Sequence, residues 1–390
     1  MTVRSLPGNE SPAVDYRQLV AEHGSPLLVL DGEALRVQYR ALAAALPGVA
    51  LHYAIKALPH PAALAVLEEL DAGFDIATAG EIEMLWDLSV NPRRTIHTHP
   101  IKKDSEIRAA LRFGCTTFVV DNLDELQKFR RYRHRVGLLL RVGVRAHDAV
   151  VDLSRKFGCA PEEVAFLLGQ AKQLGIHIKG LSFHVGSQSG SAAGHCRAIW
   201  ICNELIREAR ARELAKLTVL DIGGGFPVCY DATVPAIDAF CTPIREALAE
   251  LPEIIQVLAE PGRFLAAPAM TAIASVVGRA WRGGQRWYYL DDGVYGAFSG
   301  QIYDHARYPL STLSSEGELQ PSVLAGPTCD SIDVIAEDIQ LPELAIGDLV
   351  IGRMMGAYTW ASASEFNSLP IPRVLVVNGP VVKPTLVRVA

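Results

Sequence analysis

Residues 51–98 read LHYAIKALPHPAALAVLEELDAGFDIATAGEIEMLWDLSVNPRRTIHT. Short apolar runs at 51–57, 74–77 and 95–98 alternate here with longer segments whose apolar residues follow helical spacing. Parallel strands need a crossover connection between them, and that connection is usually a helix. The stretch therefore predicts repeated strand–helix units and a parallel sheet.

The same alternation continues on the C-terminal side of this stretch. The expected strands are 51–57, 74–77, 95–98, 116–121, 136–144, 178–185, 217–222 and 254–259. The expected helices are 61–70, 79–88, 104–113, 123–132, 161–174, 193–214 and 235–249. Eight such units predict an α/β fold with a closed, TIM-like (β/α)8 barrel, and a doubly wound open sheet is the alternative.

The pattern changes after residue 262, where short strand-like runs are separated by turn residues and no long helix intervenes. The expected strands are 276–277, 287–290, 322–324, 349–351 and 373–377. The run 26–31 precedes the barrel without a helical partner, so we expect it to join this mostly-β region. The predicted domains are a barrel over 32–265 and a discontinuous β domain made of 1–31 and 266–390.

Composition and charge exclude several classes of protein. The chain has 390 residues, of which 49% are hydrophobic and 21% charged, a balance that can bury a sizeable core. The net charge of −6 leaves no basic excess to neutralise phosphates, which argues against a nucleic-acid partner. The apolar run 265–278 is too short to cross a bilayer, which argues against a membrane partner.

The first residues and the cysteines indicate the compartment. MTVRSLPGNE has no apolar core of a signal peptide. The seven cysteines are odd in number and form no CxxC pair, so neither a disulfide framework nor a zinc site is expected. These features predict a cytoplasmic protein without a metal site.

In a barrel of this kind, chemistry gathers where strands end and loops begin. The polar residues at the expected strand ends are Lys56, Asp75, His97, His99, Arg141, His184, Gly223–Gly225, Glu260 and Arg263. Their concentration at these positions predicts an active site at one end of the barrel.

Three features in this set point to one cofactor. Lys56 follows an apolar run and, as a desolvated amine, would suit Schiff-base formation. The three glycines 223–225 let backbone N–H groups approach an anion, and Arg263 could add charge to the same phosphate. Glu260 ends an apolar run and needs a partner, such as a protonated ring nitrogen. Together they indicate pyridoxal 5′-phosphate (PLP), with His184 against its ring.

With these residues in place, the sequence resembles the barrel-type (fold type III) PLP-dependent decarboxylases that act on ornithine, lysine and diaminopimelate. The blocks that carry the resemblance are HYAIKA, GFDIATAGEIE, KFG at 156–158, SFHVGSQ, DIGGGFP, AEPGRF, DDGVYGAF, YDHA at 303–306, GPTCDSID, GAYT and FN at 366–367. They span nearly the whole chain, and the family's fold agrees with a barrel and a β domain.

The resemblance implies a role for each matching residue. It implies that PLP contacts Lys56, Asp75, Arg141, His184, Ser187, Gly224, Gly225, Glu260, Arg263 and Tyr358. Among these, Lys56 would bind the cofactor covalently, His184 would stack on its ring and Glu260 would pair with its ring nitrogen. The resemblance also implies a head-to-tail homodimer in which Cys329 and Asp330 reach the other subunit's site, with Cys329 as proton donor.

The matching residues that would contact the substrate favour ornithine. It implies that Tyr303, Asp304, Cys329, Asp330 and Phe366 lie at the substrate. Diaminopimelate decarboxylases usually have a glutamate after the cysteine, whereas this chain has Asp330. Two aspartates suit a distal ammonium and would repel a distal carboxylate. We expect ornithine decarboxylation to putrescine, as in polyamine biosynthesis, with lysine to cadaverine close behind and diaminopimelate as the alternative.

The chain differs from the usual family sequence at two places, and two other functions are alternatives to decarboxylation. Family members often read FNG where this chain has Phe366-Asn367-Ser368, and the bulky Trp360 follows GAYT. Both changes could reshape the substrate end of the pocket.

A non-catalytic homologue that acts by binding would usually lose the lysine or the cysteine block, and this chain keeps both. A racemase of related fold would place arginine, rather than Glu260, against the ring nitrogen.

Overall fold

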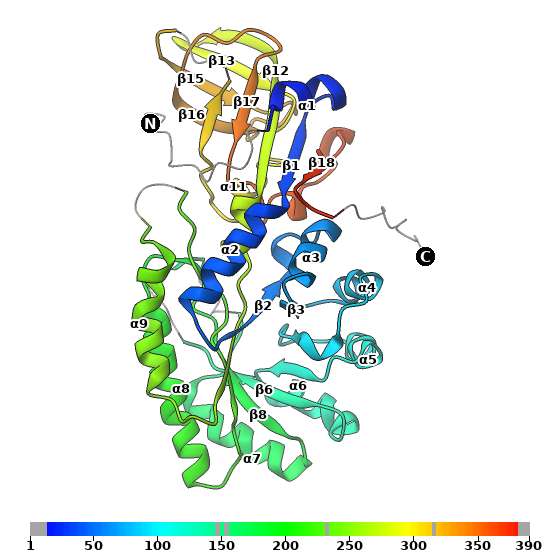
Figure 1. Cartoon of the computed structure of the whole chain (residues 1–390), viewed down its shortest axis with the longest axis vertical. Helices are drawn as coiled ribbons and strands as arrows, with labels where there is room; N and C mark the ends of the chain where they lie inside the picture. Colours follow the sequence, from blue (N-terminus) through cyan, green and yellow to red (C-terminus); the bar gives the residue numbers. More distant parts are fainter. Residues whose placement is uncertain (1–13, 145–148, 152–155, 231–233, 314–316, 381–390) are drawn as a thin grey trace. The chain divides into compact units, whose positions relative to one another are not determined.

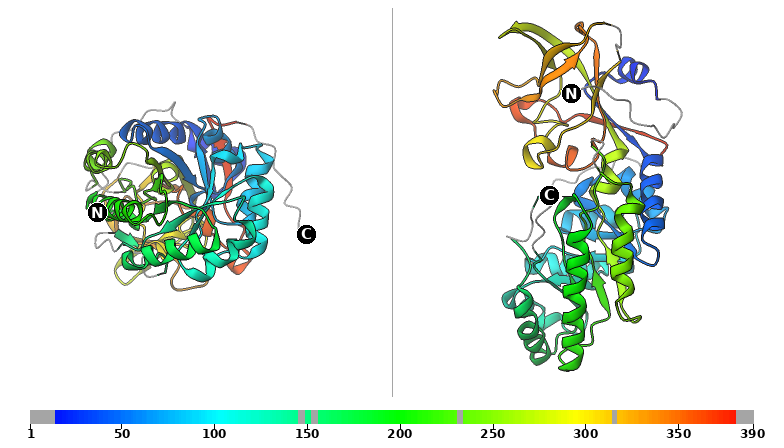
Figure 2. Two further views of the ribbon diagram at one scale, coloured as in Figure 1. Left: turned by 90° about the horizontal axis from the view of Figure 1, so that it is seen from below. Right: turned by 90° about the vertical axis from the view of Figure 1, so that its left-hand side faces the viewer.

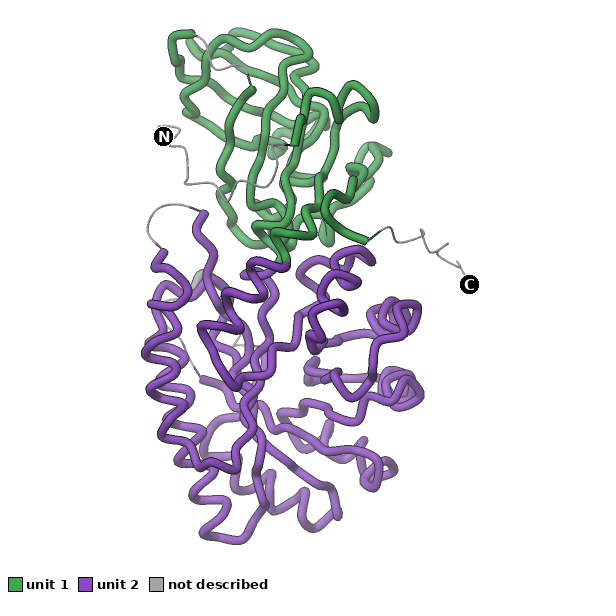
Figure 3. Tube along the Cα trace, in the orientation of Figure 1, with its two compact units in different colours: residues 1–35, 266–390 green, residues 36–265 purple. Residues whose placement is uncertain are grey.

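The chain folds into two compact units, residues 36–265 and residues 1–35 together with 266–390, which Figure 3 shows in different colours. The computed structural model describes residues 14–144, 149–151, 156–230, 234–313 and 317–380. The boundary falls within helix α2 (Gly32–Ala45), after Leu35. The units are described separately below.

Unit 36–265 is a closed barrel whose described part contains eight strands, each parallel to its neighbours. The strands are β2 (Ala50–Ala54), β3 (Gly73–Ile76), β4 (Thr95–His97), β5 (Thr117–Val120), β6 (Gly137–Arg141), β8 (Ile178–Ser182), β10 (Val219–Asp221) and β11 (Gln256–Ala259). Pairing of β10 with β8 and of β11 with β2 closes the ring, of which Figure 1 labels β2, β3, β6 and β8. The predicted (β/α)8 barrel is confirmed, and the open-sheet alternative is wrong.

Helices surround the strands of this unit, as both views in Figure 2 show. They are α3 (Pro61–Glu68), α4 (Ala79–Asp87), α5 (Asp104–Phe113), α6 (Leu123–Lys128), α7 (Val164–Leu174), α8 (Ala193–Ala211) and α9 (Ile237–Ala249). Local sequence sets their ends. The Thr78 side chain accepts from the Glu81 N–H at the start of α4, and Gly114, with φ of 109°, ends α5.

Aliphatic side chains fill the interior of the barrel. Ile96, Val119, Leu139, Val219 and Leu258 form one buried cluster contributed by β4, β5, β6, β10 and β11. Because β5 and β11 lie on opposite sides of the ring, their contact within one cluster shows that these side chains fill the interior. A filled barrel leaves the strand ends as the place for a site.

The second unit is a mixed, mostly-β sheet. Its strands run in the order β14 (Leu310–Thr312), β17 (Leu349–Gly352), β12 (Met270–Arg282), β13 (Gln285–Leu290), β15 (Gln320–Ala325) and β16 (Val334–Leu341). Strand β1 (Leu27–Asp31) pairs antiparallel with β12 and parallel with β18 (Arg373–Val377). A segment from the beginning of the chain thus pairs with segments near its other end.

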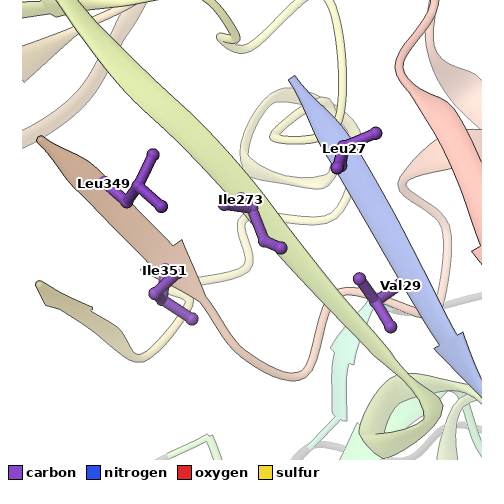
Figure 4. Close-up of a cluster of buried hydrophobic side chains, with 5 residues drawn as sticks. All are labelled: Leu27, Val29, Ile273, Leu349 and Ile351. Carbon is purple, nitrogen blue, oxygen red and sulfur yellow. The ribbon is translucent and has the colours of Figure 1, made fainter. Parts of the chain in front are cut away.

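Alternating side chains of these strands build the core of the sheet. Figure 4 shows Leu27 and Val29 of β1 beside Ile273 of β12 and Leu349 and Ile351 of β17. Leu27 is paired in register with Ile273, and Ile273 with Ile351. Because side chains alternate between the faces of a strand, these residues share one face. That shared face explains why β1 belongs to this sheet.

Several elements differ in length from the predicted ones. The strand predicted at 276–277 is part of the long β12, whose polar end, GRAWR, hides its strand character and pairs with β13. The strand predicted over 51–57 stops at Ala54, where a 3₁₀ turn (Ile55–Ala57) begins. Strands β14 and β16, helix α1 (Tyr16–His23) and the pairing of β7 (Ala149–Val151) with β9 (Ser187–Ser189) were not predicted. No helix among the described residues is long and apolar enough to cross a membrane.

Candidate active site

The ends of the barrel strands carry the charged groups that the sequence singles out. Lys56 follows β2, Asp75 lies in β3, Arg141 ends β6, His184 follows β8 and Glu260 follows β11. Parallel strands of a barrel present their carboxyl ends at one rim, so these side chains share that rim.

Lys56 is oriented by the turn that ends β2. The neighbouring Ile55 and Ala57 are buried, whereas Lys56 is exposed. Its Nζ lies 2.8 Å from Asp75 Oδ2, and the second Asp75 oxygen accepts from the Thr98 hydroxyl. The desolvation expected for this amine stays a prediction, since the single chain alone does not bury it. The Lys56 side chain is 44% exposed, and the buried Asp75 carboxylate pairs with its ammonium.

Glu260 and Asp221 are two buried acids on neighbouring strands. Burial, together with the nearby Asp221 and Asp75 carboxylates, raises the pKa of Glu260 well above its usual range. Burial also raises the pKa of Asp221, whose Oδ1 accepts from the Gly223 N–H at 3.0 Å. Asp221 Oδ2 is buried and has no hydrogen-bond partner among the described residues. The pKa values of both acids stay raised although Lys56 and Arg141 lie near them, so this part of the rim would stabilise a further, bound cationic group.

Arg141 supplies part of that positive charge. Burial lowers its pKa, and the neighbouring carboxylates, Glu260 first, oppose this effect. The guanidinium carbon lies 5.4 Å from the ring centre of Phe157, in the KFG block. Arg141 thus faces the acids of the site on one side and an aromatic ring on the other.

His184 packs against the glycine-rich loop after β10. Burial and the charge of Arg141 lower the pKa of His184 well below its ordinary value, so the ring is neutral. Its Nδ1 accepts from the Gly186 N–H at 3.0 Å, which leaves Nε2 as the nitrogen that carries the proton. A Cβ at Gly224 would lie 3.1 Å from that Nε2 and 2.8 Å from the Glu260 carbonyl oxygen. Only glycine fits at 224 beside the imidazole and Glu260.

Arg263 forms a second polar cluster at the rim. It is buried, and its Nε and Nη2 donate to the Ser187 hydroxyl at 3.1 and 3.0 Å. Its Nη1 donates to the Tyr230 hydroxyl at 3.0 Å. Gly225, with φ of 98°, joins this region through its carbonyl oxygen, which accepts from the Ser189 N–H. Hydroxyls, a guanidinium and a glycine-rich loop form a donor set suited to phosphate.

Of two further predicted residues, His97 lies away from this rim chemistry, whereas His99 lies beside it. His97 is fully buried against Phe118, and burial lowers its pKa to about 3. Neither ring nitrogen has a hydrogen-bond partner among the described residues. His99 meets the Phe157 ring edge-on, and its Nδ1 accepts from the Ile101 N–H. These contacts place His97 in the core rather than at the rim.

The predicted substrate residues belong to the second unit, where the structure groups three of them. Tyr295 donates to Asp330 Oδ2 at 2.5 Å and stacks on Phe366, with ring centres 4.2 Å apart. Cys329 is exposed and contacts Asn367 through both its N–H and its Sγ. The aromatic pair and Asn367 thus hold the Cys329-Asp330 dipeptide.

The other three residues of this unit lie in nearby turns of the chain. Tyr303 ends the short helix α11 (Gly300–Tyr303) and is 68% exposed, and Asp304 follows it. Tyr358 adopts a left-handed backbone with φ of 56° in the turn before Thr359.

Comparison with known proteins decides the family. Residues 33–267 match the family model described as "Pyridoxal-dependent decarboxylase, pyridoxal binding domain". This chain belongs to the pyridoxal-dependent decarboxylases. A lysine/ornithine decarboxylase of Selenomonas ruminantium is 39% identical over 355 residues, which cover 90% of each protein. A chloroplastic ornithine decarboxylase of Nicotiana glauca is 34% identical and is covered over 83% of its length by 90% of this chain.

Solved structures of this decarboxylase family agree with the fold. The lysine/ornithine decarboxylase of Vibrio vulnificus, in complexes with cadaverine and with putrescine, is 54% identical with a TM-score of 0.89. The alignment covers 93% of this chain and 97% of that one. The predicted decarboxylase family is confirmed, and PLP is the cofactor of this chain.

The residues at the barrel rim fit that cofactor. Lys56 offers an amine for the aldehyde, and the buried acids Glu260 and Asp221 need a positive partner such as a protonated ring nitrogen. The Arg263 and Ser187 cluster offers donors to a phosphate. The donor set therefore matches each polar part of the decarboxylase cofactor.

Five contact residues in these clusters were given no role by the sequence analysis: Thr98, Asp221, Tyr230, Tyr295 and Asn367. Asp221, Tyr295 and Asn367 lie within motif blocks already quoted, so position within a block was the available signal. Thr98 and Tyr230 act through hydroxyls on Asp75 and Arg263, and their separation along the chain hides both contacts.

Proposed function

We propose that this chain decarboxylates L-ornithine to putrescine and also accepts lysine, releasing cadaverine. The observation that carries the proposal is Asp330. Its carboxylate is held by Tyr295 and by the Ile332 N–H, and it forms no ion pair within the described part of the chain. Such a carboxylate suits a lone distal ammonium. The names of the Selenomonas and Vibrio relatives, lysine/ornithine decarboxylases, support the same substrates.

The cofactor would be held by residues of the rim. In this proposal, PLP is bound by Lys56, Asp75, Arg141, His184, Ser187, Gly224, Gly225, Glu260, Arg263 and Tyr358. Lys56 is the covalent attachment, with its amine oriented by Asp75. Ser187, Gly224, Gly225, Arg263 and Tyr358 bind the phosphate.

The electrostatics of the rim determine what the chain contributes to the reaction. When bound, PLP withdraws electrons from the substrate α-carbon, which makes loss of CO₂ possible. Glu260 would serve this chemistry by pairing its carboxylate with the ring nitrogen and so holding a proton there. His184, whose imidazole is neutral, would stack on the ring and add no competing charge. Arg141 offsets the remaining acids of the rim.

The second unit supplies the proton and the substrate contacts. The Cys329 thiol returns a proton to the α-carbon after CO₂ has left. Asp330, assisted by Asp304, binds the distal ammonium. Tyr303 and Phe366 contact the aliphatic part of the substrate. Lysine differs from ornithine by one methylene, which discriminates by only about 1–3 kcal/mol, so activity on both is expected.

The working form in this proposal is a homodimer. Cys329 and Asp330 of one subunit complete the barrel site of the other. Cys329 is exposed and Tyr303 is 68% exposed within a single chain, as residues that act on another subunit should be. The compartment we propose is the cytoplasm, since all seven cysteines are free thiols.

The deciding experiment measures kcat/KM for L-ornithine, L-lysine and meso-diaminopimelate by CO₂ release on one preparation. The expected order is ornithine first, lysine second and diaminopimelate far behind. A preference for diaminopimelate would show that Asp330 and Asp304 do not bind a lone ammonium. A parallel set of D-amino acids tests the stereochemistry.

A further inference from the structure

The turn at Phe366-Asn367-Ser368 has an unusual backbone. Asn367 and Ser368 both lie in the left-handed region, with φ of 56° and 58°. Asparagine enters this region more readily than other residues with a side chain, and glycine enters it freely. This is also where the chain has Ser368 in place of the glycine that family members often carry. The turn places the Asn367 side chain on Cys329 and the Phe366 ring on Tyr295, which donates to Asp330.

Asn367 contacts the cysteine at two points. Its Oδ1 accepts from the Cys329 backbone N–H at 3.1 Å and from the thiol Sγ at 3.3 Å. Because a backbone N–H can only donate, the amide atom facing it must be the oxygen, and the amide orientation is thereby settled. An amide oxygen only accepts, so its contact with Sγ requires the thiol to keep its proton.

Phe366 contacts the aspartate indirectly. Its ring stacks on Tyr295 with an interplanar angle of 20°, and the Tyr295 hydroxyl donates to Asp330 Oδ2. This hydrogen bond lowers the pKa of Asp330 and keeps it a carboxylate. One turn thus contacts the Cys329 thiol through Asn367, and it supports the Asp330 carboxylate through Phe366 and Tyr295.

The loop that carries the pair is anchored independently. Buried Asp333 accepts from the Thr328 N–H and hydroxyl at 3.0 and 2.7 Å through Oδ2. Through Oδ1 it accepts from the Val294 N–H at 2.8 Å. Loss of the Asn367 amide would therefore leave the backbone of the loop in place, and its effect would be local to the thiol.

We propose that Asn367 is a positioning residue that orients the S–H group of Cys329 for its proton transfer. The inference rests on the proposed role of Cys329 as proton donor. In that step the S–H bond breaks and a C–H bond forms with the electron pair that CO₂ leaves on the α-carbon. Sulfur keeps the S–H electron pair as a thiolate, which regains a proton from water.

The test compares two substitutions at one position. Asn367→Gly keeps the left-handed backbone and removes the amide, whereas Asn367→Asp keeps an accepting oxygen and adds negative charge. Iodoacetamide attacks the thiolate, so alkylation of Cys329 at neutral pH, followed by mass spectrometry of its peptide, reports the proton on sulfur. We expect alkylation several-fold faster than wild type in Asn367→Gly and slower in Asn367→Asp.

Kinetics on ornithine provide the second readout. Asn367→Gly should lower kcat on the order of tenfold while KM changes by less than roughly twofold. Tyr295→Phe should do the reverse, raising KM and leaving the alkylation rate unchanged. Ser368→Gly, which restores the relatives' glycine in the same turn, should leave kcat, KM and alkylation near wild type.

Two results would overturn the inference: an unchanged alkylation rate in Asn367→Gly, or faster alkylation in Asn367→Asp. General damage to the turn would speed alkylation in both variants, so opposite signs separate positioning from misfolding. Failure of the proposed function appears elsewhere, as full activity of Cys329→Ala or as no activity on ornithine, and leaves the alkylation comparison readable.

Discussion

Glu260 in the barrel and Asp330 in the β unit are both acids, but their surroundings shift their pKa values in opposite directions. Burial among other carboxylates raises the pKa of Glu260 well above its usual range. A tyrosine hydroxyl and a backbone N–H lower the pKa of Asp330. The buried acid needs a positive partner to become charged, whereas the hydrogen-bonded acid is charged beforehand. The difference suits one for a ring nitrogen and the other for a substrate ammonium.

Removing the charge of the buried acid should have the larger effect. Glu260→Gln keeps the shape and loses the carboxylate that holds a proton on the cofactor ring. We expect kcat to fall roughly 10²–10³-fold, as when one preorganised electrostatic group is lost. The variant should still bind the cofactor, which absorbance will show. The exposed Glu253→Gln is the matched control, and an unchanged kcat in Glu260→Gln would contradict the role.

Removing the charge of Asp330 should affect substrate binding more than turnover. Asp330→Asn leaves a distal ammonium without its ion-pair partner, and hydrogen bonds between charged groups are stronger than those between neutral ones. The KM for ornithine should rise roughly ten- to a hundredfold. The exposed Asp338→Asn in β16 serves as the control. If KM is unchanged while kcat falls, Asp330 acts on the chemistry and not on the ammonium.

The smallest expected effect concerns stability of the cofactor-free protein. Folding raises the pKa of Glu260 above its ordinary value of 4.5. As pH rises, the folded state therefore keeps the Glu260 proton to a higher pH than the unfolded state does. Stability contributed by this site is therefore lost as pH rises above about 4.5. Glu260→Gln, which cannot ionise, should raise Tm of the cofactor-free protein at neutral pH and have less effect near pH 4.5.

Thermal scans of both cofactor-free proteins across this pH range provide the measurement. A Tm difference that is independent of pH would mean that Glu260 titrates alike in the folded and unfolded chains, so that folding does not raise its pKa. Saturation with PLP should reduce the difference, because a positive partner stabilises the charged acid.

The barrel and its chemistry were readable from the sequence because their signals are local. Each strand–helix unit repeats a pattern within a few dozen residues, and Lys56 and Glu260 stand out as charges beside apolar runs. The decarboxylase blocks add residues such as Ser187 and Tyr358 by position only. The exposure of Lys56 was not foreseeable, since it depends on a 3₁₀ turn and on Asp75, a neighbour in space.

The contacts of the second unit were beyond sequence reasoning for a physical reason. Tyr295 and Asp330 are 35 residues apart, and Cys329 and Asn367 are 38 apart. These contacts depend on the loop that Asp333 anchors and on a left-handed turn. The sequence FNS predicts that turn less clearly than FNG would, because serine enters the left-handed region less readily than glycine. Helical or strand periodicity carries no information on such contacts.

In the proposed homodimer, barrel residues of one subunit and the Cys329-Asp330 pair of the other form one working site. Mixing inactive Lys56→Ala with inactive Cys329→Ala subunits tests it directly. If subunits exchange freely, half of the dimers are mixed and each holds one intact site, so about a quarter of wild-type activity should return. No recovery, despite exchange demonstrated with differently tagged subunits, would show that both residues act within one chain.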